Sequence, residues 1–192
     1  MALPDSIKRV DGTSFIFAYD TEWPASPTTG WSATVDAEID MGGLADAGAR
    51  QSVKADLTAN RDTEYLVELS VECDVDPDAG STIDIYAGFS DSATAGTGNP
   101  AMLSGTDSDY SGGAAGTLAE GLKQLTWIGS LVLQVKNDAD AEPQVGVVGY
   151  VKPTGRYMMI VARNQSGQAL GAAGVADECA VRVTGMTLQT QD

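Results

Sequence analysis

The sequence predicts an all-β fold, an antiparallel β-sandwich of about eight or nine strands with a jelly-roll-like arrangement. Two observations predict it. Apolar and polar residues alternate with a period of two over most of the chain, and turn-forming sequences separate the alternating segments. A length of 192 residues with 43% apolar residues is enough for one domain with a substantial core.

The alternation gives the expected strands in chain order. The first strand carries Phe15, Phe17 and Tyr19 on one face. Further alternating segments lie at residues 34–41, 52–57, 65–73, 83–89, 145–151, 156–164 and 179–188. Residues 124–135 are mostly apolar on both faces, which indicates a central strand with Trp127 in the core. One short helix is expected, because Thr117 and Glu120 have the spacing of a capping box.

Two regions are expected to be distinct from these strands. Residues 1–31 are predicted to form an N-terminal arm, made of the aromatic strand and a Pro/Thr-rich linker, with residues 32–192 as the sandwich domain. The alternative is that the first strand belongs to the same sandwich. Residues 90–116 have no period and are rich in Gly, Ser and Ala, which indicates one long loop of the kind that usually carries function. Tyr110 is expected to be an aromatic anchor at its tip.

Composition excludes several functions. The net charge of -16 argues against nucleic acid and against an anionic membrane as partners. The chain has no histidine, which excludes the Ser-His-Asp triad and every zinc site that contains histidine. No apolar run is long enough to cross a membrane. We therefore expect no enzyme activity and no cofactor.

A calcium site is a minor alternative in the long loop. Asp107, Asp109, Ser111 and Gly112 match the opening of an EF-hand loop, but Leu118 stands where the loop requires a closing glutamate. The more ordinary interpretation is a solvated loop, or a contact surface whose aspartates meet a basic partner.

A second acidic turn and the two cysteines leave similar choices open. Asp74, Asp76 and Asp78 alternate in a turn where a cation is plausible but not required. Cys73 and Cys179 lie on the apolar phase of their strands, which favours buried thiols, while a disulfide between them stays open.

Four stretches together resemble a family of small structural virion proteins of tailed bacteriophages. They are "RQSVKADLTANRDTEYLVELSVE", "SDSATAGTGNP", "LKQLTWIGSLVL" and "VGYVKPTGRYMMIVARNQSGQAL". The resemblance covers roughly residues 50–175 and rests on several segments in order, not on a catalytic signature. It implies a structural component of the virion, on the head or the tail, and it brings no catalytic residues.

The sequence therefore predicts a capsid decoration (cement) protein on the capsid surface, which binds the major capsid protein or other virion proteins and is itself an oligomer, most simply a trimer. The alternatives are a tail, baseplate or fibre-associated protein, and a carbohydrate-binding adhesin that uses Trp23, Trp31 or Tyr110 as a stacking platform. The residues expected at the protein interface are Phe15, Phe17, Tyr19, Trp23, Trp31, Asn99, Met102, Leu103 and Tyr110.

Overall fold

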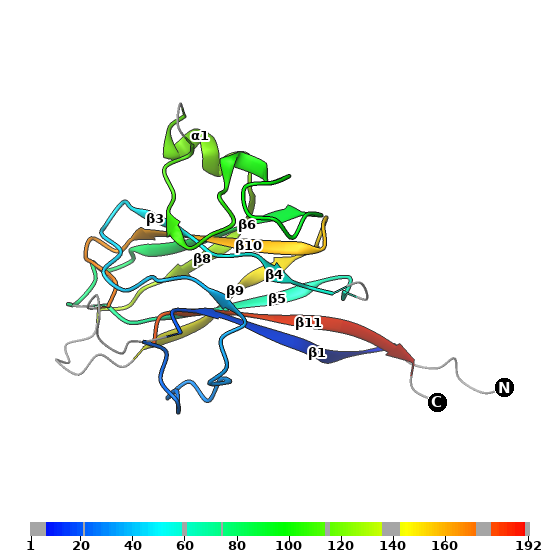
Figure 1. Cartoon of the computed structure of the whole chain (residues 1–192). Coiled ribbons are helices and arrows are strands. Elements are labelled where there is room, and N and C mark those ends of the chain that lie inside the picture. Colours follow the sequence, from blue (N-terminus) through cyan, green and yellow to red (C-terminus); the bar gives the residue numbers. More distant parts are fainter. Residues whose placement is uncertain are drawn as a thin grey trace.

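The structure, a computed structural model, consists of two β-sheets that face each other, with irregular segments, one short α-helix and one 3-10 helix, η1 (Pro100–Met102), on the outside (Figure 1). It describes residues 7–20, 22–58, 61–73, 75–113, 116–135, 143–171 and 178–190. Within these ranges the structure confirms the predicted antiparallel β-sandwich.

The first sheet has the strand order β2-β1-β11-β5-β9. Its strands are β1 (Ile7–Ala18), β2 (Ala37–Glu38), β5 (Tyr65–Val71), β9 (Gln144–Val151) and β11 (Ala180–Thr190). The second sheet has the order β7-β3-β10-β6-β8, with β4 also paired to β10. Its strands are β3 (Ala49–Gln51), β4 (Ala55–Asp56), β6 (Thr82–Ser90), β7 (Ser108–Asp109), β8 (Thr126–Val132) and β10 (Tyr157–Gln165). The pairs are antiparallel except for β1 with β2.

The described residues form eleven strands, more than the predicted eight or nine, because some alternating segments form short or divided strands. The segment predicted as a strand at residues 34–41 contributes only the two residues of β2. Nevertheless Ala37, Ile39 and Met41 are buried, as the alternation predicts. The period of two thus reports which side chains face the core, even where the backbone does not join a continuous ladder.

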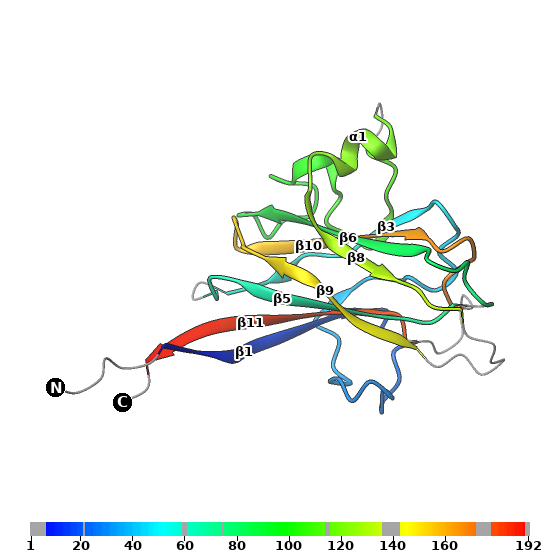
Figure 2. The same ribbon diagram turned by 180° about the vertical axis from the view of Figure 1, so that it is seen from behind.

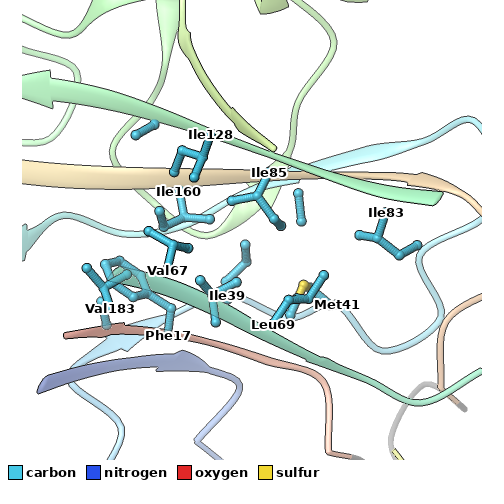
Figure 3. Packing of buried hydrophobic residues seen from close by; sticks show 14 of the residues in the cluster. Phe17, Ile39, Met41, Val67, Leu69, Ile83, Ile85, Ile128, Ile160 and Val183 are labelled. Carbon is cyan, nitrogen blue, oxygen red and sulfur yellow. The ribbon is translucent and has the colours of Figure 1, made fainter. Parts of the chain in front are cut away.

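The main core lies between the inner faces of the two sheets, where apolar side chains from both sheets meet (Figure 3). Those drawn and labelled include Phe17, Ile39, Met41, Val67, Leu69, Ile83, Ile85, Ile128, Ile160 and Val183. Two smaller clusters lie on the outer faces. Residues from the loop 90–116 and the helix cover β10, and residues 19–36 cover part of β1 and β11.

The first strand belongs to the sandwich, which was the alternative to a separate arm. β1 pairs with β11, and Phe15 and Phe17 are buried in the main core. Because β5 pairs with β11 only as far as Gly185, the outer parts of β1 and β11 continue as a two-stranded ribbon beyond the sheet (Figure 2).

The helix confirms its predicted start. α1 (Leu118–Leu122) has Thr117 as its N-cap, and both bonds of the capping box are present. The Thr117 N–H donates to the Glu120 carboxylate over 2.9 Å, and the Glu120 N–H donates to the Thr117 hydroxyl over 3.3 Å. No helix among the described residues is long and apolar enough to cross a membrane.

Candidate protein-interaction site

Exposed apolar side chains are concentrated on one side of the sandwich. Of the eight large hydrophobic residues that are exposed in the described chain, six lie on β8, on β9 or just after β8. We call this surface the β8–β9 edge, and it consists of Trp127, Val132, Val135, Val145, Val147 and Tyr150. Trp127 is 61% exposed and Val147 is 58% exposed. Grouped exposure of this kind marks a binding surface more often than scattered exposure does.

The topology explains why these two strands form an edge. β8 is the last strand of one sheet and β9 is the last strand of the other, on the same side of the sandwich (Figures 1 and 2). The strands approach so closely that a Cβ atom on Gly129 would collide with the carbonyl oxygen of Val148. Likewise, a Cβ atom on Gly149 would collide with the carbonyl oxygen of Ile128. Glycine is therefore required at both positions for the two sheets to close on this side.

The same contacts fix how the two strands face each other. Gly129 lies against Val148, and Gly149 lies against Ile128, so the strands run antiparallel. Continuing this spacing in both directions places Trp127 opposite Tyr150 at one end. It places Val132 opposite Val145 at the other end.

A bulge in each strand turns the apolar side chains outward on both sides of the contact. The pairing of β6 with β8 skips Ile128, and the pairing of β5 with β9 skips Val148. Ile128 is buried in the main core, and Val148 packs against it. Each bulge shifts the alternation by one residue and leaves Trp127 and Tyr150 on the outside. A strand with apolar residues on both faces thus exposes one of its two faces.

The sequence interpretation of this strand is corrected here. Residues 124–135 indicated a central strand with Trp127 in the core, but β8 is a terminal strand and Trp127 is exposed. A doubly apolar pattern shows that both faces lack charge, and it does not show that both faces are covered. The usable signals were the glycines at 129, 146 and 149, which mark a close approach between strands.

Most of the interface residues expected from the sequence lie inside the molecule. Phe15, Phe17, Trp23, Trp31, Leu103 and Tyr110 are buried, and Tyr19 and Asn99 are half-buried. Met102 is 71% exposed and is the member of the set with a large free side chain.

The two tryptophans near the N-terminus anchor the segment between β1 and β2. The Trp23 indole N–H donates to the Ser32 carbonyl over 2.9 Å. The Arg182 guanidinium lies 4.7 Å from the centre of the Trp31 ring. Both rings pack with Ile16 on the outer face of the first sheet. They therefore stabilise this loop and are not free to stack on a sugar.

Tyr110 is not an exposed anchor at the tip of the long loop. Its side chain is 3% exposed, and its hydroxyl donates to the Ala101 carbonyl over 2.8 Å. Together with Leu103 and Leu122 it covers Met159 on β10. The loop carries enough apolar residues to bury itself against the sheet, and for this reason its aromatic residue points inward.

The aspartates of the half-matched calcium loop are bound by a cation of the same chain. The Asp107 carboxylate accepts a hydrogen bond from the Arg50 Nε–H over 2.7 Å and another from the Asp40 backbone N–H over 3.1 Å. Asp109 lies 3.2 Å from Arg50. In the described part of the chain, no group of three or more acidic, cysteine or histidine side chains is arranged to hold a metal ion. Asp74, which belongs to the other acidic turn, lies outside the described residues.

The remaining chemical groups do not assemble a reactive site within the described residues. Cys73 and Cys179 are not joined in a disulfide, and burial raises the pKa of Cys73 to about 11, which makes it unreactive at neutral pH. A cavity of about 400 Å³ lies between the long loop and residues 43–49, and it is lined mainly by glycine, alanine and leucine. Its carboxylate, Asp109, is already paired with Arg50.

Comparison with known proteins adds no assignment: no protein-family model matches this chain, and no curated protein matches it significantly.

Proposed function

We propose that this protein is a structural virion protein of a tailed bacteriophage, and most specifically a capsid decoration protein that stabilises the head by binding capsid subunits. It acts by burying surface area against its neighbours and catalyses no reaction. The observation that carries the proposal is the β8–β9 edge, an apolar surface on a chain with a net charge of -16. Such a surface on an otherwise acidic protein favours a protein partner over a phosphate-bearing one.

Two further features support a binding role. Loops of the chain cover part of each outer face, and six of the eight exposed large hydrophobic residues in the described chain lie on the β8–β9 edge. The sequence resemblance to small phage virion proteins spans both strands of this edge. A rigid sandwich that presents one bare edge suits repeated docking on a symmetric lattice.

The number of copies per particle tests the proposal. A decoration protein follows the capsid lattice, so quantitative gel electrophoresis of purified virions should give hundreds of copies per particle. Roughly a dozen copies or fewer would contradict the head location and favour the tail, baseplate or fibre alternative. Absence from washed virions would contradict both.

A carbohydrate-binding adhesin is kept as a second candidate, because Trp127 and Tyr150 are exposed aromatic side chains at the same end of the edge. Aromatic rings of this kind can stack on sugar rings. Glycan-array binding that is lost in Trp127→Ala would favour this function. Trp31→Ala is not the right test, because the Trp31 side chain is buried.

A further inference from the structure

The β8–β9 edge has no charge along its length but opposite charges at its two ends. Residues 124–135 and 143–151 contain no Asp, Glu, Lys or Arg. Next to the Trp127 and Tyr150 end are Lys123, which follows α1, and Lys152, which follows β9. Both lysines are exposed, and neither forms an ion pair within the described ranges.

Two carboxylates near this lysine end are engaged with Arg156. Asp56 forms an ion pair with Arg156 at 2.6 Å, and Asp91 accepts the Arg156 backbone N–H over 3.1 Å. Within the described residues, Lys123 and Lys152 therefore have no counter-ion of their own.

The opposite end of the edge carries acidic groups. The N–H of Leu133, just after β8, donates to the Ser81 carbonyl over 2.8 Å, and the Ser81 N–H donates to the Asp78 carbonyl over 3.0 Å. These bonds place Ser81 beside the Val132 end of the edge, while the Asp78 N–H donates to the Ser166 carbonyl over 3.0 Å, at the neighbouring end of β10. Asp76 and Asp78 are both exposed.

We propose that two copies of this chain bind each other through their β8–β9 edges, around a two-fold axis perpendicular to the strands. In this arrangement the lysine end of each copy faces the aspartate end of the other, and the uncharged strip between the ends is buried. A two-fold axis parallel to the strands would instead bring lysines against lysines and aspartates against aspartates, which is repulsive.

The charge pattern favours a second copy over other occupants. A partner that is acidic throughout would be attracted at the lysine end and repelled at the aspartate end. A second copy, turned end for end, matches both ends with one interface used twice, as two-fold pairs do. This pairing gives a dimer, whereas the trimer expected from the sequence would need two different contact surfaces. The proposal concerns the isolated chain. It uses the same β8–β9 edge as the proposed capsid contact, so a copy paired in this way must separate before that edge binds a capsid subunit.

Sedimentation velocity and light scattering of the purified full chain test the pairing over a range of concentrations. We expect a monomer–dimer equilibrium that is weakened about ten-fold or more in the double variant Trp127→Ser, Val147→Ser. Met102→Ser is the matched control, because it removes an equally exposed apolar side chain outside the edge and should leave dimerisation unchanged. Circular dichroism and melting temperature establish that each variant is folded.

Charge exchange tests the orientation of the two copies. The pair Lys123→Glu, Lys152→Glu should weaken self-association, and so should the pair Asp76→Lys, Asp78→Lys. Mixing the two variant proteins should restore dimers, because both contacts of the mixed dimer then join opposite charges. A chain that stays monomeric at all concentrations, a trimer, or a dimer indifferent to Trp127 would overturn the proposal. Failure of the mixture to recover would show that these charges do not govern the pairing. Self-association that neither variant pair weakens would overturn the end-for-end orientation, because in the other orientation each end already faces its own kind.

Discussion

Two apolar surfaces of this sandwich differ in what covers them. The outer face of β10 presents Met159 and Val161, and the chain covers them with Leu103, Tyr110 and Leu122 from the long loop and α1. The β8–β9 edge is also apolar, but the described residues leave it exposed. The first surface therefore contributes to the stability of the single chain. The second contributes when another molecule binds.

The covered face has polar anchors that the exposed edge lacks. Arg50 and Gln51 lie on β3, Lys54 directly precedes β4, and all three hold the long loop. Gln51 accepts the Ser104 N–H over 2.7 Å, and Lys54 donates to three backbone carbonyl oxygens of residues 92, 94 and 97. A loop that looks unstructured in sequence is thus fixed by side chains from a neighbouring strand.

Removing a large side chain from each of the two surfaces should give the largest difference in the free energy of unfolding. Tyr110→Ala deletes a buried ring and its bond to Ala101, so we expect a loss of about 3–4 kcal/mol in the free energy of unfolding. Trp127→Ala deletes an exposed ring and should cost the monomer less than about 1 kcal/mol. Urea denaturation at a concentration where the chain is monomeric measures both.

Tyr110→Phe separates the two parts of the Tyr110 effect. It keeps the ring but leaves the Ala101 carbonyl without its donor, and a loss of about 1 kcal/mol is expected. If Tyr110→Ala costs no more than Trp127→Ala, the long loop is not held on the sheet and the comparison between the two surfaces fails.

The sequence could predict the sandwich because alternation depends on each strand's own residues. It could not predict which strand is terminal, since that depends on pairings between distant segments such as β5 with β9. For the same reason Trp127 was expected in the core and Tyr110 on the surface, which reverses their observed positions. The helix start at Thr117 was predictable, because a capping box is complete within four residues.

The Arg50 anchor should contribute more than a similar ion pair elsewhere. Arg50→Met leaves the Asp107 carboxylate, whose side chain is 13% exposed, without its cation. We expect a loss of about 2–3 kcal/mol, because a carboxylate removed from water needs a partner. The control is Arg156→Met, which breaks an ion pair of similar length whose two side chains are more than 40% exposed. It should cost much less stability, because water and salt screen an exposed ion pair. Equal losses in thermal unfolding would show that burial does not strengthen the Arg50 contact.

Lys54 should have a smaller effect on the same loop. Its ammonium group donates to the carbonyl oxygens of Ser92 and Thr94 over 2.8 Å and to that of Thr97 over 3.0 Å. Burial lowers the pKa of Lys54, so the cost of desolvation offsets part of what these bonds contribute. We expect Lys54→Met to lose about 1 kcal/mol.

Ammonium chloride should restore more of the melting temperature of Lys54→Ala than choline chloride does, because only the small cation fits among the three oxygens. Equal effects of the two salts would argue against this cation cage.

Acid should affect the anchored loop and leave the exposed edge unaffected. Burial raises the pKa of Asp40 above its ordinary value near 3.8, although Arg50 partly opposes this. A raised pKa means that the folded protein binds the proton more tightly than the unfolded chain, so the ionised group costs stability at pH 7. This cost falls as the pH drops through the folded-state pKa towards 3.8. Asp40→Asn should therefore raise the free energy of unfolding by up to about 0.5 kcal/mol at pH 7. This increase should shrink towards pH 4. Trp127→Ala should differ from the parent chain by the same amount at both pH values, because residues 124–135 and 143–151 hold no carboxylate. A loss of stability for Asp40→Asn at pH 7 that shrinks as the pH falls would mean that the Arg50 contact outweighs burial at this site.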